Sequence, residues 1–271
     1  MRTRRPLPPS FEAVLLHDWL VQEEVMLAWW RSARRFPPVT LGLIGACVVG
    51  FAASGWVLLT LQRAGAPRMR RWTLWDEALF LSGAREHDAV LDGELWRMGA
   101  CIFLHGGPLH LALNMLALFG LGRLCETAYG PWRMLWMFLA SGLAGSALSQ
   151  LGGTPLSVGA SGGVFGLLGA GVVFGLRYRA DLPEPMRKVF GRGLLPWVFL
   201  NLFIGFAIPG IDNLGHIGGL LGGAACAAVL GSRVVPWSPQ RERWTPFFAV
   251  TSLALLGWIG WAMARAILGA V

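Results

Sequence analysis

Long apolar runs are the feature that most constrains the fold of this chain. A helix needs about 20 mostly apolar residues to cross the hydrocarbon core of a membrane, and several runs approach or reach that length. Lipid offers no hydrogen-bond partners, so each run must satisfy its backbone groups internally, as a helix. The sequence therefore predicts an all-α polytopic membrane protein. We expect seven spans, at about residues 39–61, 101–122, 134–152, 158–176, 194–210, 214–231 and 246–267.

The composition agrees with this class. Hydrophobic residues make up 55% of the chain and charged residues 14%, with a mean hydropathy of +0.54, far from the values of a soluble domain. The net charge of +8 comes almost wholly from arginines, because Lys188 is the one lysine. In a membrane protein such charge belongs to loops on the cytoplasmic side. We therefore expect the lipid bilayer as a partner, and no nucleic acid.

The cysteines point to packing rather than to chemistry. All of them lie in or beside apolar runs, without a C-x-x-C pair, which is typical of small core residues rather than of disulfides or metal ligands. We expect no metal and no cofactor. The residues are Cys47, Cys101, Cys125 and Cys226.

The loops predict the orientation. Most connections are short, so neighbouring helices should be antiparallel, but residues 62–100 carry six arginines, six acids and several tryptophans. That mixture is typical of a structured interfacial loop. A cytoplasmic N-terminus places 16 basic residues in cytoplasmic segments and 7 outside. We therefore expect an integral protein of a bacterial inner (plasma) membrane with its N-terminus in the cytoplasm.

Three regions follow from this topology. Residues 1–38 form a cytoplasmic N-terminal tail, residues 39–231 a six-span core, and residues 232–271 a cytoplasmic loop with the seventh helix. Residues 11–30 have the periodicity of a helix lying on the membrane surface. An ordinary cytoplasmic tail explains the same residues equally well, so both interpretations stay open.

A serine between small residues opens the fourth predicted span. Ser161 is followed by Gly162, Gly166 and Gly169, whose helical spacing lets another helix approach closely. A later span carries His216 in a similar glycine-rich setting. If these two helices touch, a serine nucleophile lies beside its base.

His216 is the only acid, base or histidine of its predicted span. An ionisable group at membrane depth is costly and is therefore a functional candidate. Gly219 and Gly223 follow at helical spacing and share its face, which can press against the Ser161 helix. Considered alone, His216 is equally explained as a neutral histidine bonded to a backbone carbonyl. The matching setting of Ser161 favours the catalytic interpretation.

The second predicted span adds two hydrogen-bond donors. His110 and Asn114 are four residues apart and lie on one helix face. Acyl transfer needs donors aimed at the oxygen that becomes negative, although polar groups also join helices in bundles. His105 precedes the helix, and we interpret it as anchoring the loop. The predicted topology places His110, Asn114, Ser161 and His216 at similar depth, toward the outer side.

Other intramembrane chemistries fit less well. A zinc site would need a motif such as H-E-x-x-H or three well-placed ligands, and no acid neighbours the histidines in sequence. An aspartyl dyad needs two carboxylates at one depth, whereas Asp212 alone lies near a span. Transporters carry charges or broken helices at mid-membrane, but four of the predicted spans contain no charged residue.

In combination, these motifs resemble those of the rhomboid family of intramembrane serine proteases, over about residues 39–231. The resemblance rests on Trp96-Arg97, on the H-x4-H-x3-N spacing of His105, His110 and Asn114, on Gly159 to Gly162, on Glu126, and on His216 with Gly219 and Gly223.

The resemblance implies a rhomboid-like six-helix core plus one C-terminal transmembrane helix. It implies a Ser161–His216 dyad without a third acid, and an oxyanion hole formed by His110, Asn114 and the Ser161 backbone amide. It also implies transmembrane protein substrates that are cut near their outer end. Intact helices shield their carbonyls, so substrates with Gly or Pro near that interface should be preferred. An inactive rhomboid-like protein that binds membrane clients is the alternative, which the intact Ser161 and His216 disfavour.

Two positions depart from the family pattern. Gly215 replaces the usual alanine, and Phe165 stands where many relatives carry tyrosine. In the family that ring packs on the catalytic histidine, and phenylalanine can still stack there, without the hydroxyl.

Overall fold

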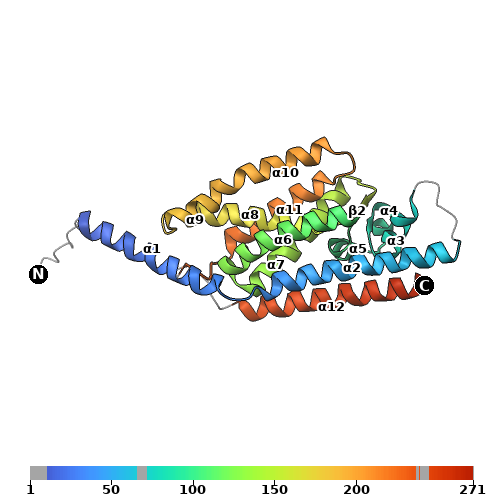
Figure 1. The fold of residues 1–271 in the computed structure, drawn as a ribbon, viewed down its shortest axis with the longest axis horizontal. Helices are drawn as coiled ribbons and strands as arrows, with labels where there is room; N and C mark the ends of the chain where they lie inside the picture. The colour runs from blue at the N-terminus through green and yellow to red at the C-terminus, as the bar shows by residue number, and fades with distance from the viewer. Residues whose placement is uncertain (1–10, 66–71, 236–237, 239–243, 271) are drawn as a thin grey trace, which may run out of the picture.

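The computed structural model describes residues 11–65, 72–235, 238 and 244–270 (Figure 1). Residues 1–10 of the predicted tail lie outside this part. The elements are α1 (Phe11–Ala33), α2 (Pro38–Arg63), α3 (Leu74–Ser82), β1 (Arg85–Glu86), α4 (His87–Leu91), α5 (Arg97–Ala100), the 3-10 turn η1 (Cys101–Phe103), α6 (Pro108–Tyr129), α7 (Pro131–Leu151), β2 (Leu156–Ser157), α8 (Ser161–Arg177), α9 (Glu184–Val189), the 3-10 turn η2 (Gly191–Leu194), α10 (Leu195–Ala207), α11 (Asn213–Val229) and α12 (Thr245–Ala270).

The predicted all-α polytopic class is confirmed. In the described part of the chain, five helical segments are long and apolar enough to cross a membrane, namely α2, α6, α7, the α9–α10 segment and α12. The other two predicted spans correspond to α8 and α11, which are apolar helices of 17 residues each. The core therefore has six helices, and α12 is added at its C-terminal end.

The second span was predicted too early in the chain. Its helix, α6, begins at Pro108 and ends at Tyr129, rather than covering 101–122. Cys101–Phe103 forms a 3-10 turn, and these buried apolar residues belong to the core below the loop. Proline starts a helix well because its fixed φ suits the first turn and its missing N–H is not needed there. This correction places His110 in the first turn of α6.

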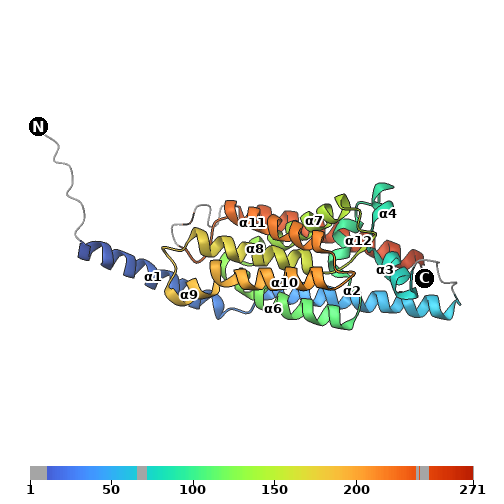
Figure 2. The same cartoon turned by 90° about the horizontal axis from the view of Figure 1, so that it is seen from above.

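Helix α8 is the innermost helix and packs against α6, α7, α10 and α11 (Figures 1 and 2). Its contact with α11 is built on glycine. A Cβ atom added at Gly219 would collide with the backbone of Gly162, and one at Gly223 with the backbone of Gly166. The two backbones can approach this closely only because no side chain intervenes.

Helices α10 and α12 flank this centre on opposite sides in Figure 1. Helix α12 lies along α7 and also contacts α3 and α5. Its Ile259 fills the space above Gly99, where an added Cβ would come within 2.5 Å of Ile259 Cδ1. Met263, one turn later, packs against the buried cluster formed by Leu79, Ala84 and Leu104. The last helix thus supports the loop region between α2 and α6.

Residues 62–100 contain α3, β1, α4 and α5, with residues 66–71 outside the described part. The expected structured loop is therefore present. Its strand β1 pairs antiparallel with β2, with Arg85 opposite Ser157 and Glu86 opposite Leu156. This short ladder attaches the loop to the segment that leads into Ser161.

Helix α1 leaves the bundle at the end opposite these loops and runs outward along the long axis (Figures 1 and 2). Its inner face is fixed by the buried Val25, by an edge-to-face contact of Trp29 with Phe190, and by a hydrogen bond from Ser32 Oγ to Thr127 O at 3.1 Å. A helix over residues 11–30 is thus present, and its placement on a membrane surface stays a prediction.

Candidate active site

Ser161 is the first residue of α8 and is half-buried. A sharp turn at Gly159, with φ of +132°, delivers the chain from β2 to this position. That conformation is in the left-handed region, which glycine adopts without steric penalty. A Cβ at Gly159 would lie 2.9 Å from His110 Nε2 and 3.7 Å from Ser161 Oγ. A side chain at position 159 would therefore collide with the His110 ring beside the Ser161 hydroxyl.

His216 is in the first turn of α11, and its ring stacks on Phe165 with centroids 4.3 Å apart and planes inclined by 12°. Phe165 is four residues after Ser161, so both project from the same face of α8. The structure thus brings His216 to the Ser161 face. Ser161 and His216 do not form a hydrogen bond, and among the described residues His216 Nδ1 has no hydrogen-bond partner. Catalytic hydrogen bonds often tighten only when substrate binds.

The glycines next to this pair lie at the helix contact. Gly162 follows Ser161 and faces Gly219, which is three residues after His216. Gly162 also lies near α7, with an added Cβ 3.6 Å from Gly142 Cα. Bulk at these positions would separate the helices that carry the serine and the histidine.

His110 and Asn114 lie in the first two turns of α6. His110 Nδ1 accepts a hydrogen bond from Gly106 N at 3.2 Å, which leaves Nε2 as the donor of a neutral ring. Nε2 is the nitrogen beside Gly159. Asn114 is buried, and its Nδ2 donates to His110 O at 3.0 Å. The structure therefore brings His110 to the Ser161 turn, whereas Asn114 bonds within its own helix.

His105 is fully buried in the loop before α6, and its ring lies edge-to-face against His110 with centroids 5.2 Å apart. Burial, with a smaller effect of His110, lowers the pKa of His105 to about 4. Next to it, Trp75 Nε1 donates to Gly106 O at 3.0 Å. His105 therefore contacts the His110 ring from the loop before α6.

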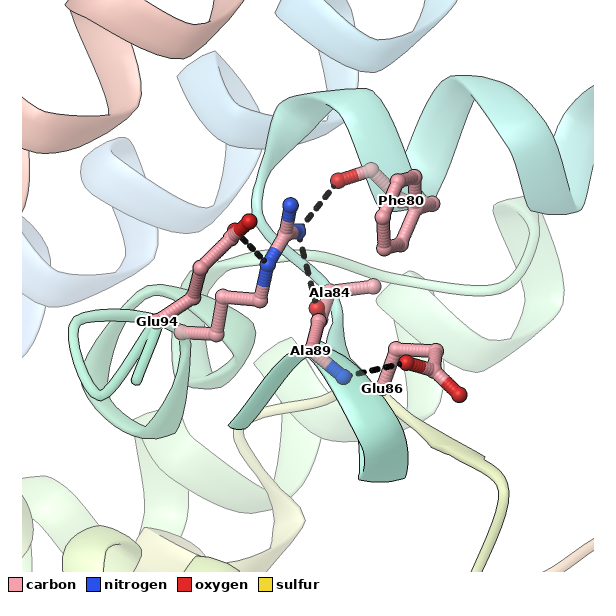
Figure 3. Close-up of polar contacts among 6 residues, drawn as sticks. Phe80, Ala84, Glu86, Ala89 and Glu94 are labelled. Carbon is pink, nitrogen blue, oxygen red and sulfur yellow. Dashed lines mark hydrogen bonds and ion pairs between the residues drawn. The ribbon is translucent and has the colours of Figure 1, made fainter. Parts of the chain in front are cut away.

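Trp96 and Arg97 organise the loop and do not line the Ser161 turn. Arg97 donates hydrogen bonds to Glu94 Oε2 at 2.6 Å and to the backbone carbonyls of Phe80 and Ala84. Figure 3 shows these three acceptors close together. Its guanidinium also lies 4.1 Å from the centroid of the Phe80 ring. A Cβ at Gly83, with φ of +115°, would come within 2.6 Å of Trp96. The pair closes α3 onto α5.

A second polar cluster, around Asp212, is absent from the sequence-based prediction. Asp212 caps α11, with Oδ1 accepting from Gly215 N at 2.9 Å. Only the placement of an aspartate just before an apolar run indicates such a cap in sequence. A Cβ at Gly215 would lie 2.9 Å from Asp212 Oδ2, so a side chain at this position would require the Asp212 carboxylate to shift.

Within the described residues, no group of three or more histidine, cysteine or acidic side chains is arranged to hold a metal ion. The polar groups around the Ser161 turn are a hydroxyl, two imidazoles and an amide. Such groups suit acyl transfer through a serine nucleophile.

Comparison with known proteins identifies the family of the chain. The family profile described as "Rhomboid domain" matches residues 92–233. The chain is 42% identical to "Rhomboid protease GluP" of Bacillus subtilis (strain 168) over 155 residues, covering 57% of this chain and 30% of that protein. It is 32% identical to "Rhomboid protease AarA" of Providencia stuartii over 168 residues, covering 54% of this chain and 59% of that protein.

A plant protein, "RHOMBOID-like protein 5" of Arabidopsis thaliana, is 41% identical over 151 residues, covering 55% of this chain and 48% of its own length. The matched part thus spans less than two thirds of each of these relatives. The matched profile extends from the loop before α5 to the end of α11 and contains each residue of the candidate site. The chain belongs to the rhomboid family.

Proposed function

We propose that the protein is an intramembrane serine endopeptidase in which Ser161 is the nucleophile and His216 the base. The observation that carries the proposal is the stack of His216 on Phe165, because Phe165 lies one turn after Ser161 on the same helix face. The glycine contact of α8 with α11 supports it, because it holds the two helices together beside these residues. Protease-named relatives add weight from comparison.

The proposed reaction follows the serine-hydrolase pattern. Ser161 Oγ attacks the carbonyl carbon of the scissile peptide while His216 takes the hydroxyl proton, and a tetrahedral oxyanion forms. His216 then gives the proton to the leaving amine, which leaves an acyl-enzyme on Ser161. Water activated by His216 attacks the acyl carbon, and the new carboxyl end departs as Ser161 regains its proton.

The oxyanion is stabilised from two sides in this proposal. Ser161 begins α8, so its backbone N–H and the positive end of the helix dipole face the developing charge. His110 supplies the second donor through Nε2, beside Gly159. Asn114 would have to turn its amide from the His110 carbonyl toward the substrate. Each such donor typically contributes about 100- to 1000-fold to the rate.

The proposed substrates are transmembrane proteins. A peptide bond inside a helix has its carbonyl engaged in a hydrogen bond, so the substrate must unwind before Ser161 can attack. Helix-weak residues such as Gly and Pro near the cleavage site lower that barrier.

The orientation is proposed with the N-terminus in the cytoplasm. The start of α1 and the C-terminal end of α12 lie at opposite ends of the bundle, and β2, which leads into Ser161, lies at the same end as the last turns of α12 (Figure 1). Reporter fusions after residues 235 and 270 test this: the first should behave as cytoplasmic and the second as external. The reverse pattern would contradict the proposed orientation.

A fluorophosphonate probe on the detergent-solubilised full chain tests the activity. Wild type should be labelled and should cleave a transmembrane model substrate. Ser161→Ala should lose both, His216→Ala should be labelled far more slowly, and Ser252→Ala on α12 should match wild type. A folded wild type that binds membrane proteins but neither labels nor cleaves them would instead support the inactive client-binding alternative.

A further inference from the structure

The carboxylate of Asp212 is the centre of a hydrogen-bonded cluster that joins four segments of the chain, three of them directly. Its Oδ2 accepts hydrogen bonds from Ser157 Oγ at 2.6 Å and from Ser149 Oγ, while Oδ1 accepts from Gly215 N at 2.9 Å. Ser149 belongs to the last turn of α7, Ser157 to β2, and Gly215 to the first turn of α11. One side chain thus joins three elements.

The fourth segment is contributed by Arg85 of β1, which is fully buried. Its Nη2 donates to Ser149 Oγ at 3.1 Å and to Thr154 O at 2.8 Å, and its Nη1 donates to Gln150 Oε1 at 2.8 Å. The Ser149 hydroxyl accepts from Arg85 and donates to Asp212, so the two charges are connected through it. Burial lowers the pKa of Arg85, but a guanidinium stays charged at working pH.

The cluster closes into a ring. Arg85 lies directly opposite Ser157 in the β1–β2 ladder, so the path from Arg85 through Ser149, Asp212 and Ser157 returns to its start. Charged partners make these hydrogen bonds stronger than bonds between neutral groups. A ring of this kind fixes its members relative to one another better than separate contacts would.

The ring has a defined relation to the proposed catalytic pair. Ser157 precedes Ser161 by four residues, and Asp212 precedes His216 by four residues. The Ser157–Asp212 hydrogen bond therefore ties the segment that ends in the nucleophile to the helix turn that carries the base. The backbone of Asp212 also contacts the proposed base directly, because its carbonyl oxygen accepts a hydrogen bond from His216 N at 3.1 Å.

We propose that Asp212 is a positioning residue, whose carboxylate holds the Ser161 turn and the first turn of α11 in the register that proton transfer requires. This inference rests on the proposed function. Its physical reason is the steep dependence of rate on geometry, since a misplacement of about 1 Å costs on the order of 100-fold. Helix capping alone would be a stability effect and would not require the bond to Ser157.

Two substitutions separate positioning from capping. Ser157→Ala removes the tie to β2 and leaves the cap of α11 untouched. Asp212→Asn keeps a good capping residue but removes the negative charge to which both serine hydroxyls donate hydrogen bonds. We expect each to lower kcat about 10- to 100-fold with KM within about threefold of wild type. Ser157→Thr, which keeps the hydroxyl, should restore kcat to within about threefold. Asp92→Asn, at an exposed loop position, is the matched control.

A double-mutant cycle completes the test. Because Ser157 and Asp212 act through one bond, the double variant should be no slower than the slower single variant. Thermal unfolding in the same detergent reports whether each variant is folded. Wild-type kcat in a folded Ser157→Ala variant, or failure of Ser157→Thr to restore the rate, would overturn the inference. If wild type itself is not labelled by the fluorophosphonate probe, the proposed function fails instead. The failure of the inference and the failure of the proposed function are therefore distinguishable.

Discussion

Phe165 lies flat against His216, with ring centroids 4.3 Å apart and an angle of 12° between the planes. An offset or parallel stack of this kind holds an imidazole in one orientation and is worth about 1 kcal/mol beyond its buried area. The aromatic face, not a hydroxyl, makes this contact, so we expect phenylalanine to orient the imidazole without a tyrosine hydroxyl.

Phe165→Leu should therefore lower kcat about 10- to 100-fold, because the imidazole loses the surface that orients it. Phe165→Tyr should keep most of the activity, since the ring is preserved. Steady-state cleavage of one transmembrane substrate by both purified variants checks this. Equal losses in the two variants would show that ring stacking is not what the site needs.

Gly219→Val should abolish most activity although residue 219 touches no reacting atom. A Cβ there collides with the Gly162 backbone, so α8 and α11 must separate beside Ser161, with a loss of at least about 100-fold. The melting temperature should also fall, because close packing drives helix association in lipid. Gly120→Val on α6 is the control, since an added Cβ meets nothing within 4 Å there. Similar activity of the two variants would contradict the proposed geometry.

His110→Ala and Asn114→Ala should each reduce kcat by about 10- to 1000-fold with little change in KM, because oxyanion donors act mainly in the transition state. The His110 effect should be the larger, since its Nε2 already lies beside the Ser161 turn and Asn114 must first turn its amide. Leu113→Ala on the same helix, whose side chain is exposed, controls for damage to α6. A change confined to KM would indicate substrate docking instead.

Glu126→Ala should destabilise the protein without a direct effect on chemistry. The buried carboxylate accepts hydrogen bonds from Thr40 N at 2.9 Å, Thr40 Oγ1 at 2.6 Å and Val39 N at 3.2 Å, and so fixes the start of α2 on α6. Loss of a buried charged acceptor costs about 2 to 4 kcal/mol. Denaturation in mixed detergent micelles measures the change, with the exposed Glu24→Ala as control. An unfolding free energy equal to that of wild type would remove Glu126 from this structural role.

Stability should decrease in acid through His105. Its pKa is about 4 in the folded protein and 6.5 in an exposed histidine. Between these values the unfolded chain binds a proton that the folded protein does not, so stability falls as the pH drops from about 6.5 to about 4. The loss is at most about 3 kcal/mol. Melting temperatures at pH 7 and pH 4.5 should differ less in His105→Asn than in wild type, and the exposed His17→Asn should behave as wild type. Identical pH dependence in His105→Asn and wild type would refute this.

The spans, and the candidate pair Ser161 and His216, can be predicted from sequence for simple reasons. Apolar length identifies a membrane helix almost regardless of context. Ser161 and His216 are polar groups among glycines, and glycine spacing indicates which faces can touch. These signals are local, so one sequence contains them.

The start of α6 was not accessible in the same way. Cys101–Phe103 is as apolar as a span because it is buried under the loop, and hydropathy does not separate the two kinds of burial. The Asp212 ring was missed because its members come from four different segments, with Arg85 and Asp212 more than 120 residues apart. Only the fold shows that Arg85 and Ser157 are opposite one another. The function of Arg97 in closing α3 onto α5 likewise depends on carbonyls that any sequence would provide.

Ile259 of α12 occupies the volume that a side chain at Gly99 would need. Each of these positions limits what the other can become. A larger residue at position 99 would push α12 away from α5, and a chain without α12 would leave the glycine under an unfilled apolar hollow next to Arg97. A larger side chain at 99 should therefore be tolerated better when residue 259 is made smaller than when it is changed alone.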